Sequence, residues 1–107
     1  MHEITLISGN LNKVNDLSQL LGLKLKHKDI ELVEIQSTNV VDVIKHKARE
    51  AYAKLGSPVL VDDAGLTIEH WGKLPGALIK YFITEIGLAG ILEMLGDAPR
   101  DAYMEML

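Results

Sequence analysis

Short apolar runs that alternate with helical repeats constrain the fold of this chain most strongly. Residues 3–8 form an apolar, β-rich run that ends at the turn Ser8-Gly9-Asn10. Beyond the turn, apolar residues recur at helical spacing: Val14, Leu17, Leu20 and Leu21. Gly22 then provides a natural helix stop. The opening segment therefore predicts a strand, a loop and a helix.

The same alternation continues along the rest of the chain. We expect further strands over residues 30–35, 58–63, 67–71 and 102–106, with an Ala64-Gly65 turn leading into the strand over 67–71. We expect helices over residues 40–55 and 77–95, the second either interrupted at Gly87 or divided there into two packed helices. The predicted fold class is α/β, with a mixed β-sheet flanked by helices, in a single domain over residues 1–107.

The amino-acid composition excludes several classes of binding partner and of chemistry. The formal net charge of -4, about +1 in residues 1–54 and -5 in residues 55–107, predicts no general attraction to nucleic acid or acidic membranes. The absence of Cys excludes disulfides, thiolate metal sites and thiol nucleophiles. No apolar run approaches the ~18 residues of a membrane span, and the N-terminus lacks a signal-peptide pattern. We therefore expect a cytoplasmic protein that binds any anionic ligand through local groups.

The segment Ser8-Gly9-Asn10-Leu11-Asn12-Lys13 lies where the first strand gives way to the helix. Backbone N–H groups, the helix dipole, a hydroxyl and an ammonium group could converge there on a phosphate. The spacing is not that of a P-loop. The alternative interpretation is structural: Ser8 or Asn10 caps the helix and Lys13 is solvated. The residues alone leave both interpretations open.

The carboxylate pair Asp62-Asp63 ends a very apolar predicted strand. Adjacent strand residues point to opposite faces, so only one of the two can face a given site. Mg²⁺ commonly takes one or two carboxylates, with substrate phosphates completing its shell, and Glu34 is a candidate second ligand. Alternatively, one of the two aspartates caps a turn before Gly65.

The remaining candidate ligand-binding side chains can each be explained by a structural role as well as by a functional one. Lys47 and Lys80 could contact phosphate, or they could be solvated on exposed helix faces. Trp71, Tyr81 and Phe82 could line a base pocket, although core packing is the simpler interpretation. The four histidines show no metal-binding spacing and receive no role.

Four segments, taken in order, resemble the inosine triphosphate pyrophosphatase family, whose members hydrolyse non-standard purine nucleoside triphosphates to monophosphate and pyrophosphate. They are Ser8-Gly-Asn-x-x-Lys13-x-x-Asp16, Glu34-Ile-Gln36, Val61-Asp-Asp-Ala-Gly-Leu66 and Leu74-Pro-Gly76. The similarity extends through residues 86–95 to Ala102-Tyr103. It covers nearly the whole chain but only the N-terminal part of the family's domain, and it implies a truncated version of the family's fold.

The resemblance implies a role for each matching residue. Ser8, Gly9, Asn10 and Lys13 would bind the triphosphate of a purine nucleoside triphosphate, and Lys47 and Lys80 would be further substrate contacts. Glu34 and Asp63 would bind Mg²⁺, and Asp63 would activate the attacking water. Such a site supplies position and electrostatic field rather than a covalent nucleophile.

Several positions depart from the family's pattern. Ser8 replaces the usual Thr, Asp16 the usual Glu, and Ala64 the usual Ser, while residues 78–82 differ from the Ser-Ala-Arg-Tyr stretch of bacterial members. The chain also ends before the family's Gly-Phe-Gly-Tyr-Asp-Pro and Ser-His-Arg motifs, which contribute to base recognition. A strand beginning at Ala102 would then leave an open sheet edge, so we expect a homo-oligomer, most simply a dimer, with the C-terminal region at the interface.

Two hypotheses follow for function. The first is a Mg²⁺-dependent nucleoside triphosphate pyrophosphatase, whose activity the missing C-terminal half could impair. The second is a non-catalytic nucleotide- or phosphate-binding module that assembles through its exposed sheet edge.

Overall fold

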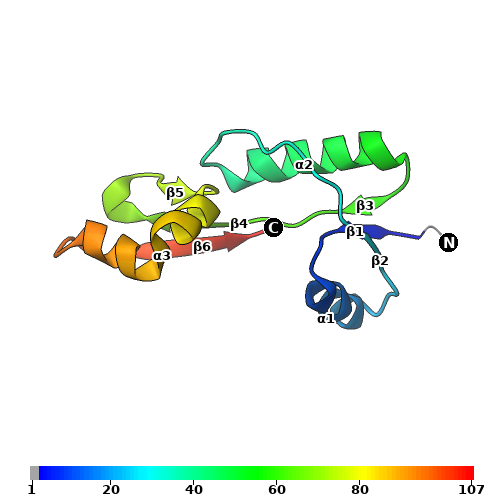
Figure 1. Ribbon diagram of the computed structural model, residues 1–107, viewed down its shortest axis with the longest axis horizontal. Coiled ribbons are helices and arrows are strands. Elements are labelled where there is room, and N and C mark those ends of the chain that lie inside the picture. Colours follow the sequence, from blue (N-terminus) through cyan, green and yellow to red (C-terminus); the bar gives the residue numbers. More distant parts are fainter. Residues whose placement is uncertain (1–2) are drawn as a thin grey trace. The chain divides into compact units, whose positions relative to one another are not determined.

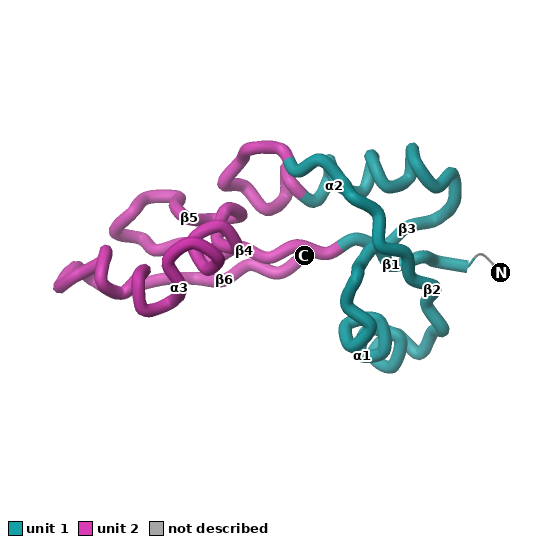
Figure 2. Tube along the Cα trace, viewed as in Figure 1, with its two compact units in different colours: residues 1–34, 44–61 teal, residues 35–43, 62–107 magenta. Residues whose placement is uncertain are grey.

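The computed structural model describes residues 3–107, which fall into two compact units (Figure 2). Unit 1 comprises Met1–Glu34 and Ile44–Val61, and unit 2 comprises Ile35–Val43 and Asp62–Leu107. The elements in chain order are β1 (Thr5–Ile7), α1 (Leu11–Leu21), β2 (Lys26–Lys28), α2 (Val40–Leu55), β3 (Val59–Leu60), β4 (Ala64–Ile68), the 3-10 helix η1 (Glu69–Trp71), β5 (Pro75–Gly76), α3 (Ile79–Leu95) and β6 (Ala102–Met106) (Figure 1). The predicted α/β class is confirmed.

Unit 1 contains a parallel sheet in the order β2-β1-β3. Figure 1 shows α1 and the C-terminal part of α2 on opposite sides of its strands. Leu6 on β1 is fully buried and clusters with Val14 of α1 and with Leu25. Leu17 packs against this cluster, whereas Leu20 is 81% exposed, so the apolar face of α1 narrows toward the end of the helix.

The predicted end of α1 is confirmed at Gly22. This residue adopts the left-handed conformation, with φ 65° and ψ 26°, and its N–H donates to the carbonyl of Gln19. The N–H of Leu23 donates to the carbonyl of Ser18 at 3.1 Å. These two bonds satisfy carbonyls that the helix would otherwise leave without partners, and glycine adopts the required positive φ without steric cost.

Unit 2 contains an antiparallel sheet in the order β5-β4-β6. Ile68 of β4 is buried against Ile91 and Leu95 of α3. Trp71 and Phe82 pack against this cluster with ring centroids 6.2 Å apart, so the core-packing interpretation of these two aromatic residues is confirmed. Parallel and antiparallel pairing thus occur in separate sheets, where the sequence suggested one mixed sheet.

The predicted break in the last helix is also present. Gly87 has φ 67° and ψ 177°, so two helical segments meet at a non-helical residue within α3. The predicted helix over 40–55 and the strand over 102–106 are confirmed as α2 and β6. None of the helices in residues 3–107 is both long enough and apolar enough to cross a membrane.

The structure differs from the sequence predictions in three segments. Residues 30–35 form no strand; the strand beside β1 is the earlier β2, whose three side chains are all exposed. Ala64-Gly65 is not a turn but the start of β4, because β6 pairs with β4 from Ala64 onward. The strand predicted over 67–71 therefore ends at Ile68, and η1 follows it.

Candidate active site

All three parallel strands of unit 1 end at the same edge of their sheet. Ser8 follows β1, Asp29 follows β2 and Val61 follows β3, with β1 paired in parallel to both neighbours. In open α/β sheets, ligands bind outside the carboxyl ends of the strands. The fold therefore brings the predicted phosphate-binding loop to the edge where such folds place their ligands.

The loop from Ser8 to Lys13 is ordered by its own side chains. The Asn10 carboxamide oxygen, Oδ1, accepts hydrogen bonds from the N–H groups of Asn12 at 3.0 Å and Lys13 at 3.4 Å. The Ser8 hydroxyl oxygen accepts from the N–H of Asn10 at 3.1 Å. Asn10 is therefore the N-cap of α1, which confirms the structural interpretation of this residue.

Capping restricts how the loop could bind an anion but does not prevent it. The N–H groups of Asn10, Asn12 and Lys13 already donate to side chains within the loop. A phosphate would therefore depend more on side-chain donors than the sequence suggested. The Asn10 cap uses only Oδ1, and the amide NH₂ of the same side chain is a donor suited to phosphate, as are the Ser8 hydroxyl and the Lys13 ammonium. Capping and binding are thus compatible roles.

Gly9 lies against a carboxylate that sequence reasoning missed. A Cβ atom built at Gly9 would lie 2.8 Å from Oδ2 of Asp29, the residue after β2. Any larger residue at position 9 would displace this carboxylate. The sequence contains no signal for the contact between Asp29 and Gly9, because Asp29 lies in a run of polar and charged residues that is typical of a solvated turn.

The two predicted metal ligands lie outside the regular strands and helices. Glu34 is half-buried in the irregular stretch between β2 and α2. Asp63 is half-buried immediately before β4, and its backbone forms two reciprocal hydrogen bonds with the backbone of Leu107. The Asp63 N–H donates to the Leu107 carbonyl at 2.9 Å, and the Leu107 N–H donates to the Asp63 carbonyl at 3.0 Å. This pairing continues the β4–β6 ladder by one residue, so the chain is extended here and does not turn at Ala64-Gly65.

The candidate lysines lie on different helices. Lys47 is half-buried on α2, within the part of that helix that belongs to unit 1. Lys80 is exposed in the first turn of α3, with its ammonium 5.2 Å from the ring centroid of Tyr81. Tyr81 is itself half exposed, so neither residue is part of the α3 core.

Unit 1 thus holds most of the predicted site residues, namely Ser8, Gly9, Asn10, Lys13, Glu34 and Lys47, and unit 2 holds Asp63 and Lys80. The convergence of Glu34 and Asp63 on one ion stays a prediction. Their carboxylates are hard oxygen donors, which fits Mg²⁺ by chemistry. Within residues 3–107 no group of three or more His, Cys, Asp or Glu is arranged to hold a metal ion.

By architecture the chain is an α/β protein with a capped strand-to-helix loop at the carboxyl edge of a parallel sheet. The model of the Ham1 family matches residues 4–106, and the chain belongs to that family. The family recognised from the sequence is confirmed, because curated relatives bear its name. Inosine triphosphate pyrophosphatase 2 of Trypanosoma cruzi is 36% identical over 105 residues, which cover 95% of this chain and 54% of that protein.

A second relative and a solved structure agree with this assignment. The dITP/XTP pyrophosphatase of Hyperthermus butylicus is 34% identical, across 89% of this chain and 50% of that protein. A solved HAM1 protein from Coxiella burnetii matches with a TM-score of 0.77 and 28% identity, across 99% of this chain and 61% of that one. The chain therefore spans about half the length of the curated relatives it matches.

Replacing the N-cap tests the structural role of Asn10. Asn10→Ala removes the acceptor of two backbone N–H groups and is expected to lower the free energy of unfolding by about 1 kcal/mol. Asn10→Ser keeps an acceptor oxygen and is expected to be within about 0.5 kcal/mol of the parent chain. Urea denaturation followed by circular dichroism measures both. Equal losses in the two variants would contradict the cap assignment.

Proposed function

We propose that this protein hydrolyses non-standard purine nucleoside triphosphates of the inosine and xanthosine type, releasing the monophosphate and pyrophosphate with Mg²⁺ as cofactor. The observation that carries the proposal is the Ham1 family match over residues 4–106, because the relatives it brings together are named inosine triphosphate and dITP/XTP pyrophosphatases. The chemistry of the loop after β1 supports it independently. That loop offers an ammonium, a hydroxyl and a carboxamide at the edge of a parallel sheet.

The proposed triphosphate contacts are Ser8, Gly9, Asn10 and Lys13, with Lys47 and Lys80 as further cationic contacts. Charge-assisted hydrogen bonds from lysine to phosphate are stronger than neutral ones and offset the charge of the triphosphate. Asp29 adds a reason for a divalent cation. Its carboxylate lies against Gly9, so a polyphosphate bound beside that residue needs positive charge to offset the repulsion.

Asp63 and Glu34 are the proposed metal ligands, and Asp63 is the proposed base. When bound, Mg²⁺ would neutralise phosphate charge and polarise the phosphoryl oxygens. The Asp63 carboxylate would orient a water molecule and accept its proton as the water oxygen bonds to the α-phosphorus. The bond from the α-phosphorus to the bridging oxygen then breaks, and pyrophosphate leaves with that oxygen. The protein's contribution is position and electrostatic stabilisation.

The direct test compares the parent chain with Asp63→Asn. With inosine or xanthosine triphosphate and Mg²⁺, the parent is expected to release pyrophosphate. Asp63→Asn keeps the shape of the side chain but removes its charge and basicity, so kcat is expected to fall by about 10²- to 10⁴-fold. A coupled pyrophosphate assay measures the rate, and calorimetry with the same nucleotide measures binding.

Two outcomes would contradict the hydrolase proposal. If the parent chain binds the nucleotide with Mg²⁺ but releases no pyrophosphate, the non-catalytic binding module is the correct hypothesis. If Asp63→Asn retains the parental rate, the proposed base is wrong. A Lys24→Ala variant is a suitable control, because Lys24 is exposed and lies in neither the loop nor the proposed lysine set.

We further propose that the chain forms a homodimer through β6. This strand is an edge strand that pairs only with β4 among the described strands, and all five of its residues are exposed. Met104 is 66% exposed and Met106 is 75% exposed, on the same face of the strand. An edge strand with exposed apolar side chains is a template for pairing with another chain.

The cytoplasm is the proposed compartment, supported by the absence of cysteine.

Replacing an edge methionine tests the dimer. Met104→Glu places a charge on the proposed interface and is expected to shift the chain from dimer to monomer at micromolar concentration. Leu20→Glu, at a side chain 81% exposed on α1, is the matched control and is expected to leave the dimer intact. Light scattering after size-exclusion chromatography gives both masses. A monomeric parent chain, or a dimeric Met104→Glu variant, would contradict the proposal.

A further inference from the structure

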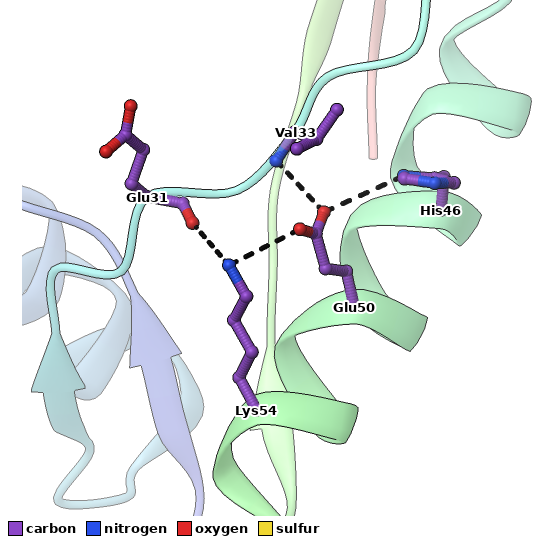
Figure 3. Close-up of polar contacts among 5 residues, drawn as sticks. All are labelled: Glu31, Val33, His46, Glu50 and Lys54. Atoms are coloured by element: carbon purple, nitrogen blue, oxygen red, sulfur yellow. Dashed lines mark hydrogen bonds and ion pairs between the residues drawn. The ribbon is translucent and has the colours of Figure 1, made fainter.

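The stretch between β2 and α2 that carries Glu34 has no strand or helix of its own. Residues 29–36 make no ladder hydrogen bonds with either sheet. Its backbone polar groups must therefore find other partners. Two of those partners are side chains on α2, a helix whose unit 1 part also carries Lys47. Figure 3 shows the arrangement, with Glu50 and Lys54 reaching from α2 to the backbone of this stretch.

Glu50 and Lys54 form a clamp on two alternate backbone groups. Glu50 Oε2 accepts a hydrogen bond from the N–H of Val33 at 3.0 Å. Lys54 Nζ donates to the carbonyl oxygen of Glu31 at 2.9 Å. The two side chains also pair with each other, with Lys54 Nζ 3.4 Å from Glu50 Oε1. The clamp therefore fixes the chain on both sides of Leu32 and ends one residue before Glu34.

Burial makes this contact more than a surface ion pair. The Glu50 side chain is only 19% exposed, whereas that of Lys54 is 47% exposed. Exposed pairs of this kind contribute little, but a charge-assisted hydrogen bond to a backbone N–H from a largely buried carboxylate is stronger. Glu50 precedes Lys54 by four residues, the favourable order for such a pair on a helix. His46 Nδ1 lies 3.9 Å from Glu50 Oε2, which is too long for a hydrogen bond.

We propose that Glu50 and Lys54 are positioning residues that hold the backbone before Glu34 so that its carboxylate can serve the metal site. The inference rests on the proposed function of Glu34 and extends it to two residues that the sequence did not single out. Glu34 follows Val33 directly, so loss of the Val33 hydrogen bond frees the backbone next to the proposed ligand. Outer groups that orient metal ligands typically account for 10- to 100-fold in metal affinity.

The same clamp connects the two kinds of group that the proposed site needs in unit 1. Lys47 and Glu50 are three residues apart on α2 and are therefore neighbours on the helix surface. The helix that presents the proposed phosphate-binding lysine thus also holds the stretch that presents the proposed metal ligand. Displacement of this stretch from α2 would separate the two.

The experiment measures the Mg²⁺ dissociation constant by calorimetry, in the chain saturated with α,β-imido inosine triphosphate, a non-hydrolysable analogue. Glu50→Ala is expected to weaken Mg²⁺ binding by about 10-fold. Glu50→Gln keeps an acceptor for the Val33 N–H and is expected to recover most of the affinity. Arg49→Ala is the matched control, because it removes a charged, exposed side chain from the adjacent position on α2. Hydrogen exchange at the Val33 amide reports on the clamp without reference to metal or activity.

The outcomes separate this inference from the proposed function. Faster Val33 exchange together with weaker Mg²⁺ binding in Glu50→Ala, but not in Arg49→Ala, supports the positioning role. Faster exchange with unchanged Mg²⁺ affinity would overturn it and leave the clamp a purely structural contact. Glu34→Gln is measured in parallel. If this variant binds Mg²⁺ like the parent chain, Glu34 is not a ligand, and both the metal assignment and the inference fall. If Glu34→Gln weakens binding and Glu50→Ala does not, only the inference falls.

Discussion

Hydrogen bonding on both edges of β1 is the constraint on which the proposed site depends. The N–H of Thr5 donates to the Pro58 carbonyl at 3.1 Å, and the N–H of Ser8 donates to the Lys28 carbonyl at 3.0 Å. These parallel pairings bring the carboxyl ends of three strands to one edge. Three segments therefore begin at that edge: the capped loop, the stretch containing Glu34 and the chain leading to Asp63. Each group with a proposed chemical role in unit 1 lies on a segment that starts at this edge or on α2.

Local signals allowed much of the fold to be predicted from the sequence. The turn at Ser8-Gly9-Asn10, the stop at Gly22 and the break at Gly87 depend on conformations that these residues adopt with their nearest neighbours. The prediction of a strand over residues 30–35 was wrong. The apolar alternation of these residues resembles a strand, but the polar residues 26–28 pair with β1 instead. Which segment completes a sheet depends on long-range pairing, and a single sequence carries little information about it.

The site was predictable only in part for the same reason. The loop residues and the paired aspartates were singled out by their chemistry and by the family resemblance. Three long-range contacts could not be found in this way. They are the approach of Asp29 to Gly9, the pairing of Asp63 with Leu107 and the clamp from Glu50 and Lys54. Each joins residues that are far apart in sequence, and none involves a residue type that is unusual for an exposed turn or helix.

The central proposal is that Glu34 and Asp63 bind the same divalent ion. Electron paramagnetic resonance with Mn²⁺ as the probe, in the presence of the non-hydrolysable nucleotide, measures this directly in Glu34→Gln, Asp63→Asn and the double variant. If the two carboxylates share one ion, each single variant loses that ion and the double variant loses nothing further, since groups that act on one bound ion are not additive. Independent, additive losses, or parental Mn²⁺ binding in either single variant, would contradict the account.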